Sequence, residues 1–259
     1  MKNKIVLLLF FSFFVYTLTS CTNDTEESFK LLTKVVETTN KGTSQTYLYA
    51  YNGNQIVSID GSQDRTDFTY ADGLISKMVT LNKTNQLRET TEYSYLKGKL
   101  VRVLSLGNYK INFIHNLDKT VSYERFTLDS GNEEIKEYHG ILYLDNENLI
   151  KEERTYDNTP AGVDSKYSVS FDYDTKKNPL FNVLGFRELL NINDKISKNN
   201  TVISTVITSV SKEDQITSSA YLYKNSFTYD LDNYPTERVS ENTVATNGNV
   251  GYLKTEYFY

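Results

Sequence analysis

Hydrophobic and polar residues alternate along most of this chain. In the stretch 168–180, Val169, Phe171 and Tyr173 occupy every second position, and the run Lys176-Lys177-Asn178-Pro179 follows them. Alternation places every second side chain on one face of an extended strand. Because proline lacks an N–H and asparagine tolerates turn geometry, the polar run ends that strand. The pattern predicts a strand followed by a turn.

The same pattern recurs through the chain as two apolar residues two positions apart, followed by a turn. Tyr51 and Tyr70 are 19 residues apart, and Tyr143 and Tyr173 are 30 apart. This spacing suits one β-hairpin per unit. The pairs are Tyr49/Tyr51, Phe68/Tyr70, Tyr93/Tyr95, Ile141/Tyr143, Phe171/Tyr173, Phe227/Tyr229 and Tyr257/Tyr259.

Short strands at regular spacing, separated by Gly-, Asn- and Asp-containing turns, predict a mainly β fold. We expect a single antiparallel meander of about 15 strands built from β-hairpin repeats, curled or barrel-like because so wide a flat sheet is unstable. The alternation fails near residues 181–192, where Leu184, Leu189 and Ile192 do not alternate and Arg187-Glu188-Leu189-Leu190 favours a helix. One short helix is predicted there.

The repeated turns resemble a known family. The sequences Tyr51-Asn-Gly-Asn-Gln-Ile56, Tyr70-Ala-Asp-Gly-Leu-Ile75 and Tyr95-Leu-Lys-Gly-Lys-Leu100 resemble the YD repeats of RHS-type bacterial proteins. The later copies, including Asp174–Leu180, are similar to small repeat-bearing outer-membrane lipoproteins of unknown function. The resemblance spans residues 45–259 and implies hairpin repeats; a structural, shell-forming role is one function that it implies.

The first residues have the features of an export signal. Lys2 and Lys4 precede an apolar run from Ile5 to Leu18, and Leu18-Thr-Ser-Cys21 follows. This order is typical of a signal peptide, and the run is shorter than the roughly 20 residues that a membrane-spanning helix needs. The four residues Leu18-Thr-Ser-Cys21 resemble the bacterial lipobox, which implies that Cys21 is acylated, for example with palmitate. The alternative is an ordinary signal peptide that contains a cysteine.

These features divide the chain into three parts. Residues 1–20 are predicted to be a lipoprotein signal peptide, residues 21–28 an acidic tether, and residues 29–259 a single β-repeat domain. Thr22 follows Cys21 where an aspartate would imply retention in the inner membrane, so the resemblance implies an outer-membrane lipoprotein. Whether the domain faces the periplasm or the cell surface stays open.

Composition narrows the range of functions. The chain has 21 Tyr, 13 Phe and no Trp, which favours strands. Its net charge of −5 disfavours nucleic acid as a partner. The one cysteine excludes a disulfide within the chain, and no cofactor is expected.

Residues for catalysis are scarce. His115 and His139 are the two histidines, too few for a zinc site without cysteines. The sequence contains neither a Gly-x-Ser-x-Gly elbow nor a phosphate-binding loop. Paired carboxylates could support glycan hydrolysis, but strand carboxylates usually lie on a solvated face. The candidates are Glu133, Glu134, Glu137, Glu152 and Glu153. We therefore expect no enzyme, with a glycan-processing enzyme as the distant alternative.

Two turn clusters are weak candidates for calcium. Asp172 and Asp174 lie near Asn178, and Asp230 and Asp232 precede Asn233. Hard cations require several oxygen ligands from a tight loop. Asp and Asn also favour turns because they cap their own backbone. Structural turns are the expected role, and no metal site is predicted.

The aromatic stripe is the feature that most suggests binding. Its rings could face a ligand, or each hairpin could use them to pack on the next. The candidate ligand-facing residues are Tyr49, Tyr51, Tyr70, Tyr95, Tyr143, Tyr173 and Tyr229. The resulting hypothesis is a lipid-anchored envelope protein that acts, without catalysis, as a binding or scaffold module for a glycan, a lipid or a protein partner.

Overall fold

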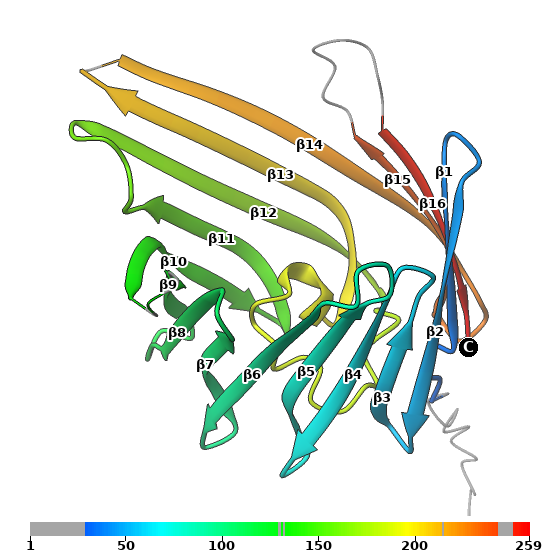
Figure 1. Cartoon of the computed structure of the whole chain (residues 1–259). Helices are drawn as coiled ribbons and strands as arrows, with labels where there is room; N and C mark the ends of the chain where they lie inside the picture. Colours follow the sequence, from blue (N-terminus) through cyan, green and yellow to red (C-terminus); the bar gives the residue numbers. More distant parts are fainter. Residues whose placement is uncertain (1–28, 129–130, 132, 214, 243–250) are drawn as a thin grey trace, which may run out of the picture.

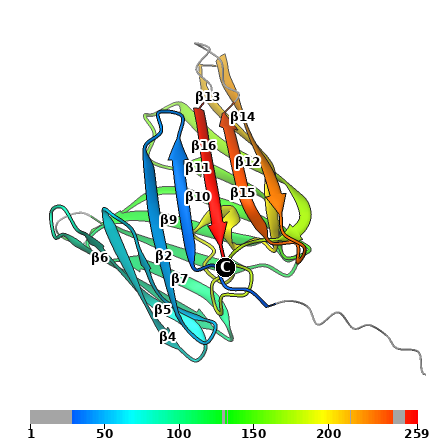
Figure 2. The same cartoon turned by 90° about the vertical axis from the view of Figure 1, so that its right-hand side faces the viewer.

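The computed structural model describes residues 29–128, 131, 133–213, 215–242 and 251–259. In this part of the chain sixteen strands form a closed barrel (Figure 1). Every strand pairs antiparallel with its neighbours in sequence, and β1 pairs with β16 to close the ring. Figure 2 brings this seam to the front. The predicted mainly β, barrel-like meander of hairpins is confirmed.

The strands are between 6 and 15 residues long. The strands are β1 Lys34–Thr39, β2 Ser44–Asn52, β3 Gln55–Asp60, β4 Asp64–Ala71, β5 Leu74–Asn82, β6 Arg88–Leu96, β7 Lys99–Ser105, β8 Tyr109–His115, β9 Val121–Leu128, β10 Glu134–Asp145, β11 Asn148–Tyr156, β12 Val163–Lys177, β13 Asn199–Lys212, β14 Gln215–Tyr229, β15 Pro235–Asn242 and β16 Gly251–Phe258. The long strands β12, β13 and β14 extend one side of the barrel far beyond the other (Figure 1).

The helix predicted near residues 181–192 is wrong. Residues 179–192 form successive turns, and a single 3-10 turn, η1 (Asn193–Ile196), follows them. Gly185 has φ +70° and lies so close to the backbone of Gly73 and Leu74 that a Cβ would meet their atoms at 3.1 Å. Contact with the barrel wall, rather than helical periodicity, therefore shapes this segment. We call residues 178–198 the closing segment.

Hairpin turns alternate between the two ends of the barrel. The two-residue turns Asp72-Gly73, Lys97-Gly98 and Asn146-Glu147 have positive φ at both positions, as the type I′ hairpin turn requires. These turns share one end with the 230–234 turn and with Tyr259, and we call it the floor end; the opposite end is the rim. The turns of the sequence repeat are thus gathered at the floor end.

The second ring of a repeat unit bonds to the preceding hairpin. In four units its polar atom donates to a backbone carbonyl just after that hairpin's floor turn, which fastens these units to their neighbours. The donors and their acceptors are Tyr95 and Ile75 (2.8 Å), His115 and Leu100 (2.8 Å), Tyr173 and Leu149 (2.6 Å), and Tyr259 and Pro235 (3.0 Å). Phe113 and His115 therefore form a repeat copy that an all-tyrosine motif misses.

One copy has a different register from the prediction. Leu142 is buried, whereas Tyr143 lies on the outer face and donates to Glu153 at 2.7 Å. The run Ile141-Leu-Tyr-Leu144 is apolar at all four positions, so alternation alone cannot choose its inner face. A shift of one residue reverses the direction of every side chain in a strand.

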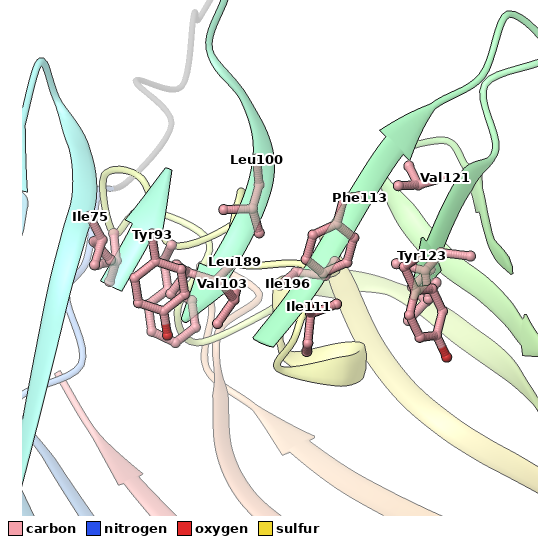
Figure 3. Close-up of a cluster of buried hydrophobic side chains, with 14 of the residues drawn as sticks. Ile75, Tyr93, Leu100, Val103, Ile111, Phe113, Val121, Tyr123, Leu189 and Ile196 are labelled. Carbon is pink, nitrogen blue, oxygen red and sulfur yellow. The ribbon is translucent and has the colours of Figure 1, made fainter. Parts of the chain in front are cut away.

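The core lies between the inner wall and the closing segment. Val183, Phe186, Leu189 and Ile196 of this segment are buried. They pack against wall residues that include Ile75, Tyr93, Val103, Ile111 and Phe113 (Figure 3). The interior of the barrel is therefore packed at the floor end.

No helix in the described ranges is long and apolar enough to cross a membrane.

Candidate functional site

The closing segment is fastened to floor turns on opposite sides of the barrel. On one side Leu184 N donates to Asn54 O at 2.9 Å, and Tyr70 donates to Leu184 O at 3.0 Å. On the other side Glu147 pairs with Arg187 at 2.8 Å and with Lys198 at 3.0 Å. These contacts hold the segment across the floor end.

A row of alternating tyrosine and arginine side chains crosses five neighbouring strands of the inner wall. The Arg125 guanidinium lies 3.9 Å from the ring centroid of Tyr109 and 6.0 Å from that of Tyr138. The Arg154 guanidinium lies 5.1 Å from the centroid of Tyr138 and 4.7 Å from that of Tyr167. Stacking of this kind fixes both cations. We call these five residues, on β8 to β12, the tyrosine–arginine strip.

Acidic partners neutralise the strip. Glu152, 4% exposed, accepts from Arg154 at 2.6 Å and 2.9 Å and also from the Tyr123 hydroxyl. Glu137 accepts from Arg125 at 2.6 Å. Burial, together with the Glu152 charge, raises the pKa of Tyr123, which keeps its hydroxyl protonated as a donor. A cavity of about 160 Å³ lies beside these residues.

A second cavity of about 170 Å³ lies where the seam strands meet the closing segment. We call it the Arg238 recess. Its lining combines charged, amide and aromatic side chains from β1, β2, β13, β14, β15 and β16 with residues of the closing segment. They include Glu37, Lys195, Thr201, Asn225, Phe227, Arg238 and Tyr257.

The outer wall carries charges in pairs. Alternation places these side chains on the face opposite to inward residues such as Glu152, Arg154 and Arg238. Apolar side chains such as Leu48, Ile114 and Ile207 are interspersed with them. The pairs are Arg65–Asp67 (2.9 Å), Lys136–Glu124 (2.7 Å), Lys151–Glu153 (2.6 Å), Lys254–Glu237 (2.9 Å) and Lys254–Glu256 (3.4 Å).

The seven tyrosines singled out from the sequence lie in three environments. Tyr49 lines the Arg238 recess, and Tyr143 faces outward. The other five are near the floor end: Tyr51 packs against the core cluster, Tyr70, Tyr95 and Tyr173 bond to backbone carbonyls, and Tyr229 donates to Asp174. Most of these rings therefore fasten hairpins and the closing segment.

Of the two calcium candidates, only Asp230 and Asp232 lie in a turn, whereas Asp172 and Asp174 lie within strand β12. The Lys30 ammonium bridges Asp230 at 2.7 Å and Asp232 at 2.6 Å, where a cation would otherwise bind. Asp174 accepts from Tyr229 and from the Asn200 backbone at 3.1 Å, whereas Asp172 is exposed. Within the described residues, no group of three or more His, Cys, Asp or Glu side chains could hold a metal ion.

The remaining sequence candidates are placed as follows. Glu134 pairs with Lys110, and His139 bonds to Asp157 at 3.0 Å on the outer face. Cys21, the signal peptide and the tether lie outside the described residues. Arg125, Arg154 and Arg238 were missed, although their inward position follows from the alternation: Arg125 is two residues from the inward Tyr123, and Arg154 two from Glu152.

Burial of Tyr93 predicts a loss of stability in alkali. Desolvation raises its pKa to about 12, while a hydrogen bond with Asn191 opposes the shift. An unfolded tyrosine ionises near pH 10. The contribution of protonated Tyr93 to the free energy of unfolding is therefore present in full below pH 10 and is lost as the pH rises through 12. At pH 11 the loss is about 1 kcal/mol.

Urea unfolding of the wild type and of Tyr93→Phe, at pH 9 and pH 11, measures this effect. The variant lacks the ionisable group, so it should lose less stability between the two pH values than the wild type. Equal losses in both proteins would contradict the assignment to Tyr93.

Comparison with known proteins was made by sequence and by structure. No protein-family model and no curated protein sequence matches this chain. Among solved structures, a porin-like protein from Bacteroides vulgatus ATCC 8482 is 14% identical, with a TM-score of 0.59 over 89% of this chain and 99% of that chain. A porin-like protein from Bacteroides uniformis ATCC 8492 is 13% identical, with a TM-score of 0.51 over 88% and 96%. The likeness is one of fold: this chain is similar to proteins described as porin-like.

Proposed function

We propose that this chain is a lipid-anchored envelope protein whose barrel is exposed to water, outside the lipid bilayer. The barrel binds a ligand on its inner wall, without catalysis. Acylation of Cys21, implied by the lipobox-like Leu18-Thr-Ser-Cys21, would supply the attachment to the outer membrane. The observation that carries the proposal is the charged outer wall.

The outer wall is unsuited to lipid. A barrel that spans a membrane presents an outward apolar band about 25 Å tall, and a Lys or Arg at its midplane costs about 2–4 kcal/mol. Here Lys136, Lys151 and Lys254 lie on the outer faces of β10, β11 and β16 in that order, each with a carboxylate partner. Such pairs are typical of a surface in water.

The interior supports binding rather than passage. The closing segment and its core obstruct the floor end, while the cavities lie against the inner wall. Their lining mixes aromatic rings with a few fixed polar groups, as ligand sites commonly do. The tyrosine–arginine strip adds planar, amphipathic surface next to one of them. This combination suits a polar ligand with ring faces, such as a glycan, better than a lipid chain.

The anchor and the barrel can be separated experimentally. Replacing residues 1–21 with a signal peptide that is cleaved without acylation should move the exported domain from the membrane fraction to the soluble fraction. The wild-type chain should stay with the membrane and incorporate labelled palmitate. The Cys21→Ser substitution should abolish this labelling. A domain that resists carbonate extraction without acylation would contradict a water-exposed barrel.

Conductance gives an independent test of the same proposal. The full-length acylated protein, added to a planar lipid bilayer, should produce no stable conductance steps, because its outer wall does not favour insertion and its floor end is obstructed. A bacterial porin added to the same bilayer serves as the positive control. Reproducible steps with this protein would overturn the proposal.

A further inference from the structure

The Arg238 recess contains two buried polar atoms that have no hydrogen-bond partner among the described residues. They are the Thr201 hydroxyl oxygen and the Arg238 Nε. Thr201 is 5% exposed, and both residues line the recess. Buried polar groups in native proteins are nearly always paired, so an unpaired one needs a reason, such as a ligand. Two such atoms on one cavity are groups with which a bound polar ligand could pair.

The charges of the recess favour an anion. Two cationic side chains, Arg238 and Lys195, line the recess together with one carboxylate, Glu37. Arg238 Nη2 donates to Thr255 Oγ1 at 3.1 Å and lies 3.9 Å from Glu37. These contacts orient the guanidinium and leave its Nε unpaired. A guanidinium with an available N–H recognises a carboxylate.

The size and the rings of the recess favour one six-membered ring. Its volume of about 170 Å³ is close to that of a cavity of about 150 Å³ that accommodates benzene. Phe227 and Tyr257 supply aromatic surface. Asn225 is held in place, because it donates to Thr201 O at 2.8 Å and accepts from Ser240 at 2.7 Å. Rigid polar groups beside rings are what orient a small ligand.

We propose that the Arg238 recess binds a single sugar residue that carries a carboxylate, that is, a hexuronate. The carboxylate accepts from Arg238 Nε, a ring hydroxyl bonds to Thr201 Oγ1, and another hydroxyl donates to Glu37. The sugar ring lies against Phe227. This inference rests on the proposed function and names the class of its ligand.

Isothermal titration calorimetry of the full-length protein in detergent tests the proposal. The probes are D-galacturonate and D-glucuronate, with D-galactose and D-glucose as neutral counterparts, all at one ionic strength. At least one uronate should bind at least tenfold more tightly than its neutral counterpart. Arg238→Met should weaken that binding at least tenfold, because it removes the charge and the donor but keeps the length of the side chain.

Two further variants separate binding from folding. Thr201→Val removes the unpaired hydroxyl at nearly constant volume, so it should weaken uronate binding at least threefold while the melting temperature holds or rises. Arg102→Gln, on the outer face of β7, should leave the affinity unchanged.

Equal binding of acidic and neutral sugars, absence of uronate binding, or unchanged affinity in both recess variants would overturn the ligand assignment. None of these results would change the outcome of the carbonate-extraction and conductance tests. The ligand assignment and the water-exposed barrel can therefore be contradicted independently of each other.

Discussion

Glu152→Ala is expected to lower the free energy of unfolding by about 3 kcal/mol, because removing one partner of a buried ion pair leaves the charge of the other uncompensated. The Glu152 side chain is 6% exposed, and it holds the Arg154 guanidinium through two hydrogen bonds. Tyr123 would lose its acceptor as well. Urea unfolding followed by tyrosine fluorescence measures the change.

The neighbouring residue provides a matched control. Glu153 lies on the outer face and pairs with Lys151 at 2.6 Å, with both side chains more than 40% exposed. Surface pairs contribute about 0–1 kcal/mol, so Glu153→Ala should have a small effect. Similar losses in the two variants would show that Glu152 does not act as a buried partner of Arg154.

Leu189→Ala is expected to cost about 3 kcal/mol of unfolding free energy, as core Leu→Ala changes that leave a cavity do. Leu189 is 0% exposed and packs inside the core that joins the closing segment to the barrel wall (Figure 3). Its loss should also expose the closing segment to protease, since this packing holds it at the floor end. Urea unfolding and limited proteolysis report the two effects.

Leu231→Ala is the matched control for the core substitution. Leu231 is 102% exposed in the 230–234 turn, and surface substitutions of this kind change stability by less than about 0.5 kcal/mol. If Leu189→Ala were as mild as Leu231→Ala, the closing segment would not be an integral part of the core.

Local patterns in the sequence determined the strands and most of their turns. Alternation of the type seen in Val169, Phe171 and Tyr173 acts between near neighbours, and turns such as Asp72-Gly73 need particular backbone angles. Both signals are complete within a few residues. They therefore predict a meander of hairpins before any long-range contact is known.

Local patterns do not predict the structure where two local arrangements of the backbone fit the sequence equally well. Ile141-Leu-Tyr-Leu144 is apolar on both faces, and its inner face was decided by pairing with β9 and β11. The closing segment has helix-forming residues, yet Gly185 and Leu184 take the conformation that contact with the floor turns imposes. In both cases packing against distant strands outweighs local preference.

What the sequence determined by itself is a chain of β-hairpins that carries a repeated stripe of aromatic side chains. Only the tertiary structure decided that the ring closes through β1 and β16, and that Thr201 and Arg238, 37 positions apart in the sequence, line one recess. The physical reason is that curvature and closure depend on pairings between residues far apart in the chain. Those pairings also decide which charges turn toward the lumen and which remain in water.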